Sequence, residues 1–189
     1  MSVLFIQIAV QEGRLDMAVN RGKQFEEVVK QSFLKVTDVS IDRLHDQTTH
    51  FKGSSANICD FIVYRKPYEY YIECKTVHGN TIPIYTPNND KKYGAFTNKQ
   101  WEGMLEKSHI PGVTAGAIIW FIDKDTTVYY PIQILEEIRN SGKKSISYDY
   151  FHPERIYLIG EKKRVLYDYD MSDLLRQLEW RFKVEIGGH

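Results

Sequence analysis

Asp60, Glu73 and Lys75 are the residues whose types and spacing could support chemistry. Burying two carboxylates beside an ammonium group costs free energy unless a metal ion or a substrate compensates for it. Carboxylate oxygens are the ligands that a hard divalent cation such as Mg²⁺ takes. In phosphodiester hydrolysis, such a cation neutralises the developing charge and lowers the pKa of a bound water. A lysine close to the cation would be pushed towards its neutral form and could orient or deprotonate that water.

A β-hairpin is expected to bring these three side chains together. β-Branched and aromatic composition predicts two strands and the turn between them, at residues 58–64, 69–75 and 65–68. We expect Tyr64 to pair with Glu69. Antiparallel counting then places Asp60 opposite Glu73, and side-chain alternation puts Lys75 on the same face. The alternative is a surface hairpin that carries ordinary exposed charges.

Composition and charge set loose bounds on the fold and its partners. The chain has 189 residues, 42% of them hydrophobic, which is enough for a real core. With 25 basic and 25 acidic residues, any polyanion site must be a local patch. Cys59 and Cys74 are expected to face each other opposite the acids, as small buried hydrophobes in a reducing cytoplasm. Zinc is not expected, because no second cysteine or histidine pair has ligand spacing.

The chain is expected to form one domain over residues 1–189, of the α/β class. Its first part, 1–19, contains a short apolar run that would form a strand or a dimer arm. The run is too short to span a bilayer and lacks the features of a signal peptide. Further expected elements are a helix over 20–33, strands over 39–44, 115–122 and 127–131, an extended segment over 80–84, a helix capped by Thr97, a helix over 132–140, a hairpin of 156–159 with 165–167 joined by 160–163, and a final helix capped by Ser172.

The arrangement of Asp60, Glu73 and Lys75 resembles the PD-(D/E)xK nuclease fold. The proline of that motif is absent, and Cys59 precedes the aspartate. The resemblance implies a restriction-endonuclease-like fold, in which helices flank a mixed central sheet. It also implies a Mg²⁺ site, which Mn²⁺ would also fill, formed by Asp60, Glu73 and the backbone carbonyl of Cys74. Lys75 would assist the attacking water.

Several further motifs, taken in order, resemble the RecU-type Holliday-junction resolvases. They are Asn20 to Lys23 with Phe25 and Glu26, the serine-rich approach to Asp60, the Glu73 to Lys75 strand, Thr81-x-Pro83, Gln100, residues 117–121 followed by 129–131, and the basic motif at 141–146. The resemblance spans residues 20–150, which would form the nuclease core, and leaves 151–189 as a C-terminal hairpin and helix. The stalk that the family inserts before the catalytic aspartate is missing here.

Additional roles are open to two polar residues and to a set of basic residues. Glu26 resembles a helix acid that tunes the metal through water, or it simply stabilises the helix dipole. Gln100 would bind the scissile phosphate or water, or cap its own helix. The candidate phosphate contacts are Arg21, Lys23, Lys52, Lys91, Lys92 and Lys99, with Lys143 and Lys144 as weaker candidates. The histidines, including His78, lack partners at triad or metal spacing and are expected at the surface or in packing.

Three functions remain open on these grounds. The preferred one is a Mg²⁺-dependent DNA endonuclease of the resolvase type, a homodimer that acts on four-way junctions and has no membrane partner. The second is a restriction-type or repair endonuclease of the same fold. The third is a non-catalytic DNA-binding or structural dimer with a decayed site. The intact Asp60, Glu73 and Lys75 set favours the first two.

Overall fold

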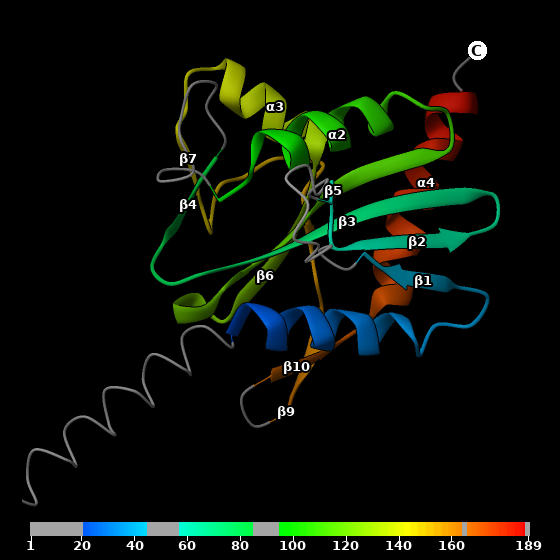
Figure 1. The fold of residues 1–189 in the computed structure, drawn as a ribbon, viewed down its shortest axis with the longest axis horizontal. Helices are drawn as coiled ribbons and strands as arrows, with labels where there is room; N and C mark the ends of the chain where they lie inside the picture. The colour runs from blue at the N-terminus through cyan, green and yellow to red at the C-terminus, as the bar shows by residue number, and fades with distance from the viewer. Residues whose placement is uncertain (1–20, 45–56, 85–94, 164–165, 188–189) are drawn as a thin grey trace, which may run out of the picture.

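A mixed six-stranded sheet forms the centre of the protein in the computed structural model, which describes residues 21–44, 57–84, 95–163 and 166–187 (Figure 1). The strand order is β1-β2-β3-β5-β6-β8. β3 and β5 are parallel, and the other neighbours are antiparallel. The strands are β1 Ser40–Arg43, β2 Phe61–Arg65, β3 Tyr68–Val77, β5 Val113–Phe121, β6 Thr126–Pro131 and β8 Ile156–Tyr157.

Helices cover both faces of this sheet, so the expected α/β fold with a mixed, helix-flanked sheet is confirmed (Figure 1). The helix described over residues 21–33 and α4 (Met171–Gly187) lie on one face. α2 (Asn98–Ser108) and α3 (Ile132–Asn140) lie on the other. Along the chain, α2 lies between β3 and β5. These two strands are parallel neighbours in the sheet, so a crossover connection must join them. A short 3-10 helix, η1 (Ile122–Lys124), links β5 to β6.

Side-chain alternation along β3 divides its residues between two hydrophobic cores. Tyr70 and Ile72 pack with Phe25 in the core beneath the 21–33 helix and α4. Tyr71 packs with Trp101 in the core beneath α2 and α3. Large side chains buried in this way each contribute about 1.5–3 kcal/mol relative to exposure. Packing on both faces holds β3 rigidly, and this strand carries Glu73 and Lys75.

Two small strand pairs complete the described structure. β4 (Thr81–Pro83) pairs antiparallel with β7 (Ser145–Ser147). β9 (Gly160–Lys163) pairs antiparallel with β10 (Leu166–Tyr169). The expected late hairpin is therefore wrong, because residues 160–163 form a strand and residues 156–157 pair with β6. β9 is mostly exposed, so it lacks the alternating apolar pattern by which a strand is recognised.

Local sequence signals predict several helix boundaries correctly and one incorrectly. Thr97 caps α2 as expected, and α3 has the expected bounds. Gly142 follows α3 with a φ of 85°, a conformation that glycine adopts without strain. The expected cap at Ser172 is wrong: α4 begins at Met171, and the Asp170 carboxylate accepts a hydrogen bond from the N–H of Asp173 at 3.1 Å. Serine and aspartate cap helices about equally well, so the sequence alone did not separate them.

Some expectations concern residues that the structure does not describe. They are the N-terminal strand or arm in residues 1–19 and the candidate phosphate contacts Lys52, Lys91 and Lys92. Within the described ranges, no helix combines the length and the apolar character that crossing a membrane requires.

Candidate active site

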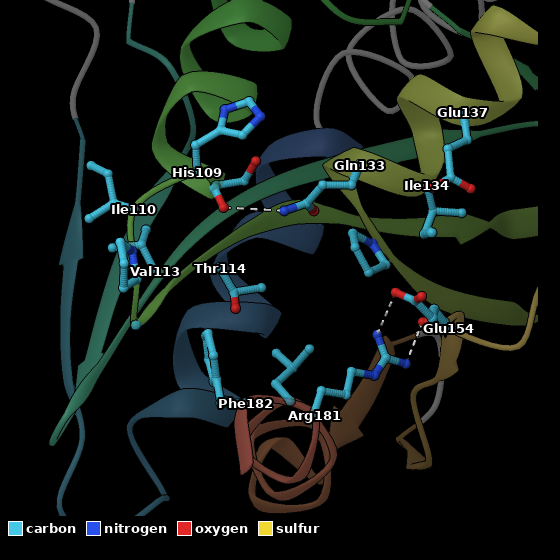
Figure 2. Close-up of a pocket in the computed structure, with 15 residues that line it drawn as sticks. His109, Ile110, Val113, Thr114, Gln133, Ile134, Glu137, Glu154, Arg181 and Phe182 are labelled. Carbon is cyan, nitrogen blue, oxygen red and sulfur yellow. Dashed lines mark hydrogen bonds and ion pairs between the residues drawn. The ribbon is translucent and has the colours of Figure 1, made fainter. Parts of the chain in front are cut away.

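Two cavities differ in whether they contain the residues expected to do chemistry. One cavity has a volume of about 470 Å³ and includes His109, Gln133 and Arg181 (Figure 2). It lies where the C-terminal end of α2 and the first turn of α3 meet α4. It contains none of the expected site residues. A second, of about 330 Å³, is lined by Lys23, Glu26, Arg43, Leu44, Asn57, Cys59, Asp60, Thr97 and Gln100. The second cavity is therefore the candidate active site, although the first is larger.

The hairpin that supplies the site has the expected register over most of its length. Tyr64 lies opposite Glu69, as the sequence predicts. The paired residues do not extend to Asp60, whose N–H donates to the carbonyl of Ile72 at 3.1 Å. The chain also bends at residues 58 and 60. Asp60 thus leaves the strand just before its expected position directly opposite Glu73.

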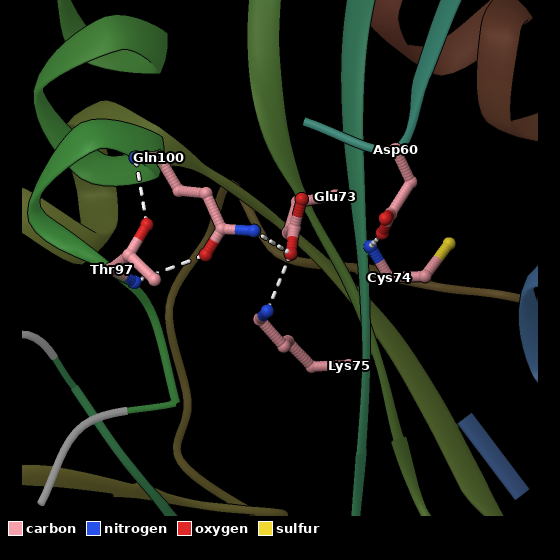
Figure 3. A network of polar contacts seen from close by, with 6 residues as sticks. All are labelled: Asp60, Glu73, Cys74, Lys75, Thr97 and Gln100. Carbon is pink, nitrogen blue, oxygen red and sulfur yellow. Dashed lines mark hydrogen bonds and ion pairs between the residues drawn. The ribbon is translucent and has the colours of Figure 1, made fainter. Parts of the chain in front are cut away.

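The Asp60 carboxylate occupies the edge of β3 where β2 has ended. Its Oδ2 accepts a hydrogen bond from the backbone N–H of Cys74 at 2.7 Å (Figure 3). In an extended strand, the N–H and C=O of one residue point to the same edge. The carbonyl of Cys74 therefore lies on the edge that faces Asp60. This places the aspartate beside the backbone carbonyl that was expected to share a cation with it.

The two cysteines are buried and free, as expected, but they do not face each other. Cys59 packs in the core beneath α2, whereas Cys74 packs in the core beneath the 21–33 helix. The bends before β2 break the side-chain alternation on which the expectation depended. Burial raises the pKa of the Cys59 thiol to about 12 and that of Cys74 well above its usual value. Both thiols therefore act as small apolar groups.

Glu73 is a buried carboxyl group with one satisfied oxygen. Its side chain is 1% exposed. Oε1 accepts hydrogen bonds from Nζ of Lys75 and, at 2.6 Å, from Nε2 of Gln100 (Figure 3). Oε2 has no hydrogen-bond partner among the described residues. The pKa of Glu73 is raised to about 8: burial is the largest cause, the Lys75 ammonium opposes it, and the charge of nearby Asp60 adds to it.

Lys75 extends from the same face of β3 as Glu73, as side-chain alternation predicts. Its ammonium lies 5.3 Å from the centre of the Phe96 ring, just before α2. The amide nitrogen of Gln100, from the first turn of α2, meets the same carboxylate oxygen (Figure 3). The structure therefore brings Asp60, Glu73, Lys75 and Gln100 together. Their catalytic and metal-binding roles stay predictions.

Gln100 caps its own helix, which is one of the two roles that the sequence left open, and its binding of phosphate or water stays a prediction. Its Oε1 accepts a hydrogen bond from the N–H of Thr97 at 3.0 Å, while its own N–H donates to Oγ1 of Thr97 at 3.2 Å. These two contacts form a capping box at the start of α2. Because the amide oxygen is held by the cap, the amide nitrogen is directed at Glu73.

Glu26 reaches the cavity from the 21–33 helix and pairs with Arg43 at the end of β1. Burial, followed by the charge of Asp60, raises the pKa of Glu26, and Arg43 lowers it. Sequence reasoning missed Arg43. Its strand was expected, but the pairing that sets Arg43 opposite Phe61 was not. Neighbouring Leu44 donates its N–H to the carbonyl of Asp60 at 2.9 Å, which fixes β1 to the site.

Three of the basic candidates, Lys23, Arg21 and Lys99, lie near the start of a helix in the described part of the chain. Lys23 lines the same cavity as Asp60, Arg21 is half-buried two residues earlier, and Lys99 is exposed beside Gln100. His78 lies at the surface as expected, where its Nδ1 is 3.0 Å from Oδ1 of Asp123.

The donor set fits a divalent cation in part. Among the described residues, no three histidine, cysteine, aspartate or glutamate side chains are placed to hold a metal ion. The expected set is smaller, with two carboxylates and the Cys74 carbonyl. The unsatisfied, buried Oε2 of Glu73 is the observation that fits a cation, since such an oxygen requires a positive partner when it is ionised.

Comparison with known proteins finds a likeness in fold only. No protein-family model matches the chain, and no curated protein matches it in sequence. Among solved structures, part of the chain is similar to Hjc, a Holliday junction resolvase from the archaeal hyperthermophile Archaeoglobus fulgidus. The two share 15% identity with a TM-score of 0.41, over 60% of this chain and 78% of that one.

Proposed function

We propose that this protein is a Mg²⁺-dependent DNA endonuclease that hydrolyses phosphodiester bonds in branched DNA, with four-way junctions as its substrate. Glu73 is the observation that carries the proposal. It is a fully buried carboxyl group with two hydrogen-bond donors on one oxygen and, within the described part of the chain, none on the other. A residue that served only the fold would be destabilising in this state at neutral pH, because burial penalises its charge. Carboxyl groups whose pKa is strongly perturbed are typical of functional sites, and Glu73 is hydrogen-bonded to Gln100, which lines the candidate cavity.

Asp60, Glu73 and the Cys74 carbonyl would hold the cation, and Mn²⁺ would substitute for Mg²⁺. A bound Mg²⁺ would supply charge neutralisation at the phosphate and a water of lowered pKa. The Cys74 N–H donates a hydrogen bond to Oδ2 of Asp60 and so fixes the orientation of this carboxylate. A cation near Glu73 would favour its ionised form and so oppose the desolvation that now raises its pKa.

The neighbouring polar residues would orient the reactants. Lys75, whose Nζ shares Oε1 of Glu73 with Gln100, would orient the attacking water or, in its neutral amine form, deprotonate it. Gln100 restrains the Glu73 carboxylate through its amide. Glu26, held by Arg43, lines the same cavity as Asp60 and would act on the cation through water. Arg21, Lys23 and Lys99 would contact DNA phosphates.

The choice of branched DNA rests on the ordered motifs of residues 20–150 that resemble the RecU-type resolvases. Resolving a four-way junction needs two symmetric cuts, for which a two-fold homodimer is the simplest assembly. Within this proposal the protein acts in the cytoplasm, where its cysteines stay reduced.

A cleavage assay in Mg²⁺ tests the proposal. The substrates are a four-way junction, a linear duplex of the same sequence and the corresponding single strand, each with an EDTA control. We expect paired cuts in the junction that disappear in EDTA. Equal cutting of the linear duplex would favour a restriction-type or repair endonuclease. Binding of DNA without cleavage in either Mg²⁺ or Mn²⁺ would favour a non-catalytic DNA-binding protein.

A further inference from the structure

Two adjacent lysines, Lys143 and Lys144, follow α3 on an exposed turn. Among the ion pairs that the described residues form, none includes either of them. Other lysines, such as Lys35 and Lys163, pair with carboxylates. The chain has equal numbers of acidic and basic residues, so cations without a carboxylate partner mark a place where an external anion can bind.

One aromatic ring contacts this turn, and the ring two residues before it in the chain contacts a third lysine. The ammonium of Lys143 lies 4.8 Å from the centre of the Tyr150 ring, and that of Lys124 lies 5.2 Å from the centre of the Tyr148 ring. A cation–π contact at an exposed site is worth about 0.5–1 kcal/mol, which leaves the ammonium free to take a stronger partner. The one acidic residue between the rings, Asp149, is exposed.

The conformation of the turn is fixed by the end of α3. The N–H of Ser141 donates to the carbonyl of Glu137 at 2.9 Å, and its hydroxyl donates to the carbonyl of Ile138 at 2.7 Å. The left-handed conformation of Gly142 then turns the chain towards β7. The lysines are thus presented from a rigid support. Basic residues beyond a helix C-terminus also stabilise its dipole, which is the purely structural alternative.

Backbone hydrogen bonds connect this turn to the candidate active site. β7, which follows the lysines, pairs with β4. The N–H of Ala95 donates to the carbonyl of Pro83 in β4 at 3.3 Å. The next residue, Phe96, lies under the Lys75 ammonium. The lysine turn and the site therefore share one continuous support on the α2 face of the sheet (Figure 1).

We infer that Lys143 and Lys144 form a second phosphate-binding surface for the DNA strand that leaves the active site. This inference rests on the proposed function. It adds the path that the DNA strand takes across the protein surface. A strand that passes Lys23 on the 21–33 helix side of Glu73 would leave across β4 and β7. Contacts of this kind bind the sugar-phosphate backbone and do not read the base sequence.

The test compares two lysine pairs in the full-length chain. Lys143→Ala with Lys144→Ala removes the proposed surface, while Lys162→Ala with Lys163→Ala removes an equally exposed pair on β9, on the opposite face of the sheet (Figure 1). Binding to a labelled four-way junction and to a linear duplex is measured in EDTA at several salt concentrations. Each lost phosphate contact should flatten the slope of log affinity against log salt by about 0.9.

We expect the first pair to flatten this slope by up to about 1.8 on both DNAs, Lys143→Arg with Lys144→Arg to retain the wild-type slope, and the β9 pair to leave it unchanged. An unchanged slope for the first pair, or an equal change for both pairs, would overturn the inference. Metal-dependent cleavage by the wild-type protein decides the proposed function separately. Wild-type cleavage combined with an unchanged slope would refute this surface alone.

Discussion

Gln100 Nε2 donates a 2.6 Å hydrogen bond to Oε1 of Glu73, and this contact joins the first turn of α2 to the middle of β3. The same amide group accepts from the N–H of Thr97 through its oxygen. Rotating the amide would break both contacts at once. The helix cap therefore sets the direction from which the buried carboxylate is held.

Replacing Gln100 should separate this role from helix capping. Gln100→Ala loses the cap contact and the Glu73 contact, whereas Thr97→Ala loses only part of the cap. Thr97→Ala should lose about 1 kcal/mol of stability, the usual cost of losing a cap, and Gln100→Ala should lose more because its hydrogen bond to the buried carboxylate is also lost. We expect DNA cleavage to fall clearly in Gln100→Ala and to stay near the wild-type rate in Thr97→Ala. Equal cleavage rates for the two variants would show that the Glu73 contact has no catalytic effect.

Glu73→Gln should change how stability depends on pH. The folded pKa of Glu73, about 8, is raised from 4.5, mainly by burial. A raised carboxyl pKa favours the fold below the unfolded value, and that contribution is lost as pH rises through the folded value. The glutamine variant has no such loss. We therefore expect its melting temperature, relative to wild type, to increase between pH 5 and pH 8.

Thermal unfolding in EDTA at pH 5, 6, 7 and 8 measures this difference directly. EDTA matters because a bound cation would remove the penalty from the wild-type protein. Taking the difference between two proteins that share every other titrating group isolates the contribution of Glu73. A difference that is constant across this range would mean that Glu73 is already ionised in the metal-free fold.

Features set by neighbouring residues were predictable from the sequence. The pairing of Tyr64 with Glu69 follows from two strands joined by a short turn. The capping box of Thr97 and Gln100 and the bounds of α3 are local as well. The convergence of Glu73 and Lys75 on one face needs nothing beyond side-chain alternation.

Features set by contacts between distant segments were not predictable in the same way. The strand pairing ends before Asp60 because the chain bends at residues 58 and 60. The same bends place the Cys59 side chain in the opposite core from Cys74. The Arg43 contact with Glu26 requires β1 to lie beside β2. β9 was missed because its side chains are polar and exposed, so no apolar face identifies it as a strand.

A homodimer is expected if the substrate is a four-way junction. Multi-angle light scattering should give twice the monomer mass of 22.2 kDa for the free protein. The same measurement on the junction complex should give two protein chains for each DNA. A stable monomer in both states would contradict the resolvase proposal, while leaving a single-strand or nicking endonuclease possible.

The most direct test of the central claim is the rate of Mg²⁺-dependent DNA cleavage by Asp60→Asn beside wild type. Asparagine keeps an oxygen that can accept from the Cys74 N–H, so the fold should survive. We predict that cleavage is abolished while DNA binding is preserved or tightened, because one negative charge near the phosphate is removed. Cleavage by Asp60→Asn at the wild-type rate would contradict the assignment of this site.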